Sequence, residues 1–429
     1  MLRKKNVIAL LGAAFAVSLV FSAQPGDAFA QQTIKIGGLI LDDPSNFNDL
    51  GREKVIEYAV SNFNAEQAAL NTEYRIEYIR IPVMFNTAGL PHEQQDVYKK
   101  VSNAYSNGIK YFVGPSPSSL ALTAKTFTDT TRDAILVSPS STAPSLATAN
   151  DSLFRLTHDD TAQAPELINI TERDGKEHLI FVQREDVWGE GLYKAISSIH
   201  QGGEARVVMK PAGSAVPASY YSDVAVQLKG EVERLASQYG ANSVGVVLIL
   251  FDSDTINLVE AALGNGADNV LSSVSWYGTD GIAGNSNLVR NAPVADFLST
   301  VRLVSTIFQA SENPTSLELA RHVEQFSGFD FAYRNSVYDA TYLLADTVIV
   351  EKESDVADIL ARELILSVAG GSAEHPHHHA SRNLGDGALG AYTLNAAGDL
   401  SEPRSYAVLR VVGADGSYGW TSSSAGICR

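Results

Sequence analysis

The first third of the chain shows a repeated succession of strand-like and helix-like hydrophobic patterns. Residues 33–41 (TIKIGGLIL) are almost continuously apolar, as in a buried strand, and residues 52–66 place Ile56, Ala59 and Phe63 at helical spacing. This alternation of strands and helices predicts an α/β lobe with a parallel, doubly wound sheet. Further strands are predicted at residues 74–81, 109–114 and 134–138, and further helices at about 94–108 and 119–130.

A second run of the same kind begins near residue 178 and predicts a second α/β lobe. Its strands are expected at residues 178–182, 205–209, 243–250 and 272–278, and its helices from about residue 190, at 222–237 and at 255–263. Beyond Gly281 the pattern changes. One strand is predicted at 301–308, helical stretches between about 316 and 368, and two closing strands at 390–394 and 405–412.

The first thirty residues have the layout of a secretory signal rather than of a folded element. Arg3, Lys4 and Lys5 precede the apolar run 7–21, and the small-residue sequence AFA ends at Ala30. Fifteen apolar residues are fewer than the ~20 that a membrane-spanning helix needs. We therefore predict cleavage near Ala30 and export to the periplasm or the extracellular space.

Charge and cysteine content narrow the possible partners and sites. The formal net charge of −17 makes nucleic acid and anionic membranes poor partners. The only cysteine is Cys428, so an internal disulfide and a cysteine-rich zinc site are both excluded. The remaining length of about 400 residues fits two domains of ordinary size.

Motifs for catalysis and for cofactors are absent from the sequence. No glycine fingerprint for a dinucleotide or a triphosphate follows any predicted strand, and no G-x-S-x-G is found. A hydrolase remains only a remote alternative, since a Ser-His-Asp triad is defined by geometry. The imidazoles between His375 and His379 lie between glycine-containing segments, and we expect a solvated loop there rather than a metal site. We predict no cofactor.

Two hydroxyl-rich loops follow two of the predicted strands in the first lobe. They are GPSPSS (114–119) and SPSST (138–142), and in open α/β sheets ligands bind beyond the carboxyl ends of strands. Ser118 and Ser119 fall where a helix begins, so their hydroxyls lie beside free backbone N–H groups at the positive end of the helix dipole. The two loops together predict a binding site suited to a carboxylate.

These loops also carry a family resemblance. The chain resembles type I periplasmic binding proteins of the branched-chain amino-acid-binding group, the extracytoplasmic receptors of ABC importers. The similarity runs from about Ile34 to Gly416, and its motifs are VGPSPSS, SPSSTAPSL, LFRLTHDDTAQA, DVWGEGLYKAI, YGTDG and SVYDATYLLADTV. The resemblance implies a fold of two lobes joined by three crossovers, with a zwitterionic ligand between them.

Matching positions to the family's motifs implies a ligand-binding set. Ser118 aligns with a carboxylate ligand, the Ser140 backbone and Thr142 with groups that hold the ammonium and carboxylate, and Asp280 with the acid that pairs with the ammonium. Trp188 and Phe251 replace ligand-facing tyrosines, Asp280 replaces a glutamate and Leu50 an aromatic residue. These departures leave the ligand class open. The full predicted set is Leu50, Ser118, Ser119, Ser140, Ser141, Thr142, Trp188, Phe251 and Asp280.

The sequence therefore predicts a solute receptor that closes on a small polar metabolite, an amino acid or a related amide, and passes it to a membrane ABC permease. The alternatives are a urea or short-amide binder and a component of a ligand-sensing receptor. We expect the first lobe to comprise residues 33–155 and 305–385, and the second 156–304 and 386–429. A monomer or weak dimer is expected. Asn150 and Asn169 lie in N-glycosylation patterns.

Overall fold

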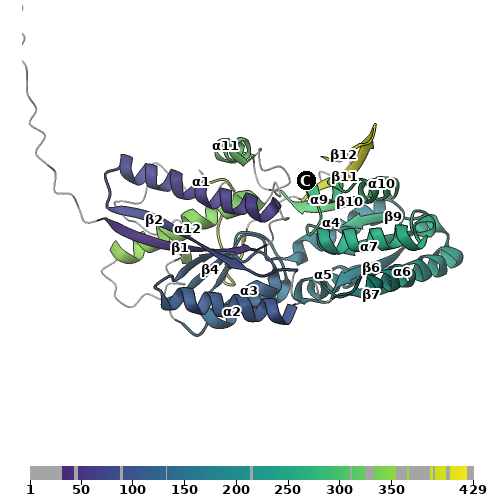
Figure 1. Ribbon diagram of the computed structural model, residues 1–429, viewed down its shortest axis with the longest axis horizontal. Helices are drawn as coiled ribbons and strands as arrows, with labels where there is room; N and C mark the ends of the chain where they lie inside the picture. The colour runs from purple at the N-terminus through teal and green to yellow at the C-terminus, as the bar shows by residue number, and fades with distance from the viewer. Residues whose placement is uncertain are drawn as a thin grey trace, which may run out of the picture.

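Two sheets, one parallel and one mostly parallel and each flanked by helices, form the two lobes of the protein in a computed structural model (Figure 1). The structure describes residues 31–42, 47–86, 90–131, 133–212, 216–309, 312–323, 333–353, 365–366, 387–389, 392–401 and 406–422, and for residues 47–50 the backbone only. The predicted signal segment and His375–His379 lie outside these ranges.

The strands are β1 (Gln32–Leu41), β2 (Tyr74–Val83), β3 (Tyr111–Val113), β4 (Ile135–Ser138), β5 (Leu153–Arg155), β6 (His178–Arg184), β7 (Gly203–Met209), β8 (Val244–Ile249), β9 (Ser275–Gly278), β10 (Val304–Phe308), β11 (Tyr406–Ala414) and β12 (Ser417–Ser422). The helices are α1 (Phe47–Ala69), α2 (Leu90–Ser106), α3 (Ser118–Thr128), α4 (Asp160–Arg173), α5 (Val187–Ser197), α6 (Ala218–Tyr239), α7 (Asp252–Asn265), α8 (Asp268–Leu271), α9 (Ser286–Arg290), α10 (Ala292–Thr300), α11 (Pro314–Val323) and α12 (Tyr333–Glu353). Two short 3-10 turns are η1 (Pro144–Leu146) and η2 (Ala241–Ser243).

The sheet orders confirm the predicted doubly wound α/β class. The first sheet has the order β2-β1-β3-β4-β5 and is parallel throughout. The second has the order β12-β11-β10-β9-β8-β6-β7, in which only β11 and its two neighbours pair antiparallel. In both sheets the strand order reverses beside the first strand of the lobe, and such a switch point is where ligands bind in open α/β folds.

One predicted strand near the end of the chain is wrong. The described part of the segment 390–394 forms only an isolated bridge between Leu394 and Leu400. The turn between these leucines contains Gly398 at φ 81°, in the left-handed region, and the chain reverses before a ladder can form. The last described strand, β12, was not predicted.

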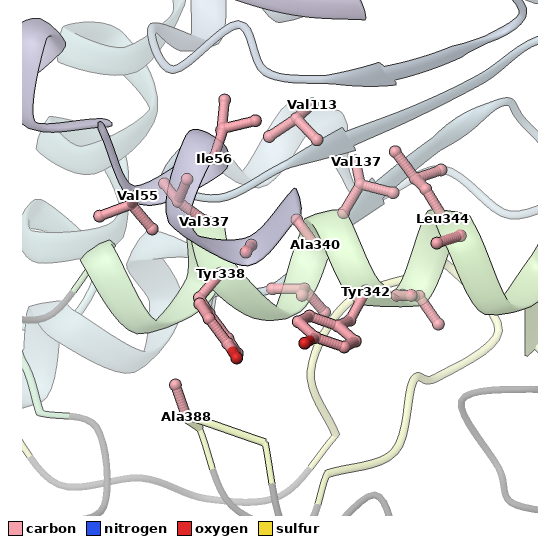
Figure 2. Packing of buried hydrophobic residues seen from close by; sticks show 14 of the residues in the cluster. Val55, Ile56, Val113, Val137, Val337, Tyr338, Ala340, Tyr342, Leu344 and Ala388 are labelled. Atoms are coloured by element: carbon pink, nitrogen blue, oxygen red, sulfur yellow. The ribbon is translucent and has the colours of Figure 1, made fainter. Parts of the chain in front are cut away.

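The core of the first lobe is completed by a helix from late in the sequence. α12, green in Figure 1, lies among the purple and blue elements and packs on α1. Its Val337, Tyr338 and Leu344 meet Ile56 of α1 and Val137 of β4 (Figure 2). The chain therefore leaves the first lobe after β5, returns to it before α12, and leaves it again before β11.

Residues 387–389 and 392–401, which the expected boundary assigns to the second lobe, pack on the first. Ala388, Leu389 and Tyr392 belong to the same buried cluster as α12, and Asp399 bridges to Arg155 at the edge of β5. Within the part of the chain that the structure describes, no helix combines the length and apolar character needed to cross a membrane.

Candidate functional site

A cavity of about 80 Å³ lies between the two lobes. Both lobes line it, and the first lobe contributes the ends of its strands and the loops that follow them. Six of the nine predicted residues are in its wall, namely Ser118, Ser140, Thr142, Trp188, Phe251 and Asp280. The wall also contains residues outside the predicted set, namely Leu41, Arg52, Phe85, Ser116, Pro117, Asp252, Gly281, Ala283, Asn285 and Tyr333.

Hydroxyl groups form the wall on the side of the first lobe. Ser118 is the first residue of α3, and its Oγ accepts a hydrogen bond from the Ala143 N–H at 3.2 Å, which joins the two predicted loops. The Ser140 Oγ is buried and has no hydrogen-bond partner among the described residues. An unpaired buried hydroxyl at a cavity wall is available to a ligand.

The predicted Ser141 and the neighbouring Ser138 support this wall from behind. Ser141 is fully buried outside the cavity lining, and its Oγ donates to the Ser116 carbonyl at 2.8 Å. The Ser138 hydroxyl donates to the Ser141 Oγ at 2.7 Å, so these two serines tie the loop after β4 to the loop after β3. Ser119 is also buried outside the lining. Leu50 belongs to α1, and for this residue the structure describes the backbone only.

Two stacked aromatic rings form the wall on the side of the second lobe. Trp188 is the second residue of α5 and Phe251 immediately precedes α7. Their ring centroids are 4.6 Å apart and the ring planes differ by 6°. A Cβ on Gly281 would lie 2.5 Å from the Trp188 ring and 2.5 Å from the Leu250 carbonyl, so the aromatic pair fits only because residue 281 has no side chain.

Asp280 supplies the acid of the site. Its Oδ2 accepts a hydrogen bond from the Tyr333 hydroxyl at 2.8 Å, while its buried Oδ1 has no hydrogen-bond partner among the described residues. Burial raises the pKa of Asp280 to about 6, although the hydrogen bond from Tyr333 lowers it. At neutral pH the carboxyl is therefore mostly ionised.

A second carboxyl lies near Asp280. Asp160, the first residue of α4, is 1% exposed, and its pKa is raised by burial and by the charge of Asp280. Its N–H donates to the Thr142 carbonyl at 2.9 Å, which places it directly behind the hydroxyl wall. Sequence reasoning missed Asp160, although it lies in the quoted motif LTHDDTAQA. Tyr333 carried no local signal because it reaches the site from a helix more than 50 residues away from Asp280.

The charges and hydrogen-bonding groups of this arrangement suit a small zwitterion. Hydroxyl groups and the N-terminal end of α3 face one side of the cavity, and a carboxylate faces the other. Among the described residues no group of three or more histidine, cysteine or acidic side chains is placed to hold a metal ion.

Solved structures of solute-binding proteins share this fold. The leucine binding protein LivK of Thermotoga maritima matches with a TM-score of 0.65 and 15% identity, over 91% of this chain and 97% of that one. LivJ of Streptococcus pneumoniae, a branched-chain amino acid transporter substrate binding protein in complex with isoleucine, matches with a TM-score of 0.63 and 15% identity, over 91% and 100%. An ABC transporter substrate-binding protein of Desulfitobacterium hafniense in complex with leucine gives 0.61 and 15%, over 91% and 100%.

Sequence comparison gives one curated relative and one family. An uncharacterized protein of Methanocaldococcus jannaschii is 25% identical over 254 residues, and the match spans 57% of this chain and 57% of that protein. The family described as the receptor family ligand binding region matches residues 51–361, well over half of the chain. The chain therefore belongs to this receptor family, and its fold is that of a type I periplasmic binding protein.

Proposed function

We propose that this protein is an extracytoplasmic solute receptor that binds an amino acid or a related amide between its lobes and delivers it to an ABC permease. The observation that carries the proposal is the interlobe cavity, with hydroxyl groups on one wall and the Asp280 carboxyl on the other. The structural neighbours whose names state an amino-acid ligand or an ABC transporter support the same class of function.

The chemistry of the walls suggests how such a ligand would bind. Its carboxylate would accept hydrogen bonds from Ser118, Ser140 and Thr142, and its ammonium would donate to Asp280. Charge-assisted hydrogen bonds of this kind contribute ~1.5–3 kcal/mol each. Trp188 and Phe251 would cover the apolar part of the ligand.

Binding in this site requires the lobes to move. Because groups from both lobes contact the ligand, the closed arrangement would be stabilised by the ligand's differential affinity for it. We place the three crossovers of the hinge after β5, near β10 and in the segment that precedes β11. The permease and the export of the chain are parts of this proposal.

A second candidate ligand class is the short amides, including urea. The specific observation in its favour is the small volume of the cavity, about 80 Å³. An Asp280 carboxyl with a pKa of about 6 can also accept hydrogen bonds from a neutral amide without a full ion pair.

A thermal-shift screen of the amino acids, short amides, urea and polyamines tests the proposal. We expect a rise in Tm with one class, 1:1 stoichiometry by calorimetry, and recovery of the ligand unchanged. Asp280→Asn should weaken an amino acid at least tenfold, about 1.4 kcal/mol, whereas Asp223→Asn on the exposed face of α6 should not. Turnover of the ligand, or unchanged affinity in Asp280→Asn, would contradict the proposal.

A further inference from the structure

Arg184 is a buried cation next to the site that none of the proposed ligand contacts uses. It is the last residue of β6, it is fully buried, and it lies outside the cavity lining. Its guanidinium forms ion pairs with Asp186 at 2.8 Å and with Asp254, and both of these carboxylates are buried as well. A buried cation held by two acids has an almost fixed position, because each hydrogen bond restricts its planar group.

Each of the two acids also holds the backbone of a helix start that carries an aromatic ring of the site. Asp186 precedes α5, and its Oδ1 accepts from the Trp188 N–H at 3.1 Å. Asp254 lies in the first turn of α7, and its Oδ2 accepts from the Phe251 N–H at 3.2 Å. The guanidinium therefore connects the two helix starts that present Trp188 and Phe251 to the cavity.

The same guanidinium also contacts the rings. Its Cζ lies 4.5 Å from the centroid of the Phe251 ring, and that ring stacks on Trp188. A guanidinium over an aromatic face is attracted by the ring quadrupole, and burial strengthens this attraction. Removing the cation would leave the rings without this contact and the two acids without their counter-charge.

Residues of the opposite lobe reach the same cluster. The Phe85 ring, just after β2, meets the Phe251 ring edge-on at 5.7 Å, and Arg184 Nη2 donates to Asn86 Oδ1 at 3.5 Å. Asn86 Nδ2 donates to the Ser253 hydroxyl at 3.0 Å. These contacts cross from the first lobe to the second and join the loop after β2 to the aromatic pair.

We propose that Arg184 is a positioning residue that holds the Trp188–Phe251 stack in its ligand-contacting place, and that Phe85 and Asn86 of the other lobe brace this stack from across the cleft. The proposal rests on the proposed function of the site. According to this proposal, the fixed position of the two rings depends on Arg184 and its two acids, which lie outside the cavity lining. It also depends on the contact between the lobes.

The test is ¹⁹F NMR of the full chain labelled with 5-fluorotryptophan, without any ligand. The three signals, from Trp188, Trp276 and Trp420, are assigned by single Trp→Phe substitutions. In Arg184→Gln we expect the Trp188 signal to shift and broaden while the other two stay in place. Arg184→Lys keeps the charge but not the planar fork, so it should also displace the Trp188 signal.

Asn86→Gly tests the contribution of the other lobe with little risk to folding. Asn86 has φ 51°, so glycine keeps the backbone conformation while the side chain is lost. We expect the Trp188 signal to move in the same direction as in Arg184→Gln, by a smaller amount. The cavity hydroxyls are untouched in this variant.

An unchanged Trp188 signal in Asn86→Gly overturns the link between the lobes, and an unchanged Trp188 signal in Arg184→Gln or Arg184→Lys overturns the positioning role. Equal shifts of all three signals would show general loosening of the fold and would also overturn it. Because no ligand is present, these results are independent of the ligand screen, and either proposal can fail alone.

Discussion

Asp280 has opposite effects on the empty receptor and on the complex that we propose. Burial raises its pKa from 3.8 to about 6, which means that the ionised carboxylate is less favourable in the folded chain than in the unfolded one. The titratable side chains that act on it or respond to it are Tyr333, Asp160 and Tyr406. A ligand ammonium would remove this cost by pairing with the carboxylate.

The variant Asp280→Asn should therefore stabilise the ligand-free protein at alkaline pH. The wild type loses stability as the pH rises from about 4 through about 6, since the unfolded carboxyl ionises first. At pH 8 we expect the Tm of the variant to be higher by about 1 °C for each 1 kcal/mol of cost removed, since an unfolding entropy of ~2.1 cal/mol/K per residue amounts to ~0.8 kcal/mol/K in a chain of about 400 residues. Below pH 4 the difference should vanish.

Differential scanning calorimetry between pH 4 and pH 8 checks this expectation. Asp223→Asn, which changes an exposed side chain of α6, is the matched control and should show no pH-dependent difference from the wild type. A lower Tm for Asp280→Asn at pH 8 would mean that the carboxylate stabilises the empty cleft.

The sequence located correctly those cavity residues whose position depends on a loop that follows a strand. Ser118, Ser140 and Thr142 line the cavity because they follow parallel strands, a position that hydrophobic periodicity locates. Ser141 shares the same loop, but its side chain has the opposite direction and supports the loop from inside. Sequence spacing alone does not distinguish these two directions.

At the scale of elements, the buried Arg155 joins the hydroxyl loop to a segment from late in the chain. Its Nε and Nη2 donate to Asp399 at 2.6 and 2.7 Å, and its Nη1 donates to the carbonyls of Ser141 and Ala143 at 3.1 and 2.9 Å. All four of these hydrogen bonds go either to the Asp399 carboxylate or to the loop that carries Thr142. The position of the loop therefore depends on this bidentate pair.

Asp399→Ala should destabilise the protein strongly. It leaves a fully buried guanidinium without a counter-charge, and breaking a buried pair in this way costs about 3–5 kcal/mol. We expect a lower midpoint in urea denaturation, with the loss of stability concentrated in the first lobe. The matched control is Lys194→Ala, which removes an exposed helical ion pair and should cost less than about 0.5 kcal/mol. Equal costs for the two variants would contradict this role of Arg155.

The order of elements was predictable where strands are buried on both faces. Apolar runs, interrupted by polar residues in β2 and β7, located the described parallel strands of both sheets to within a few residues, with the exception of β5. The antiparallel edge was harder, because β12 has no buried positions and its sequence lacks an apolar run. The packing of residues 387–389 and 392–401 on the first lobe depends on tertiary contacts such as Arg155–Asp399, which have no local pattern.

At the scale of the whole molecule, the lobes also meet about one turn further along the helix that carries Trp188. η1 of the first lobe contacts α5 of the second, where Pro144 packs on Gly191. A Cβ on Gly191 would lie 2.9 Å from Pro144 Cδ, closer than atoms normally approach, and a proline ring cannot rotate away. The absence of a side chain at Gly191 thus permits the lobes to approach fully.

Gly191→Ala separates helix stability from lobe closure, because the two effects have opposite signs. Alanine in a helix interior is more stable than glycine by roughly 0.5–1 kcal/mol, so the Tm of the ligand-free protein should be unchanged or higher. The added methyl group opposes closure, so the affinity for the ligand found in the screen should fall about fivefold or more. At saturating ligand, the variant should have a larger radius of gyration in X-ray scattering than the wild type. Gly230→Ala in α6, where a Cβ meets nothing within 4 Å, should raise the Tm and leave the affinity unchanged. If both variants bind as tightly as the wild type, then the contact between Pro144 and Gly191 does not limit closure, and the ligand must be held without full approach of the lobes.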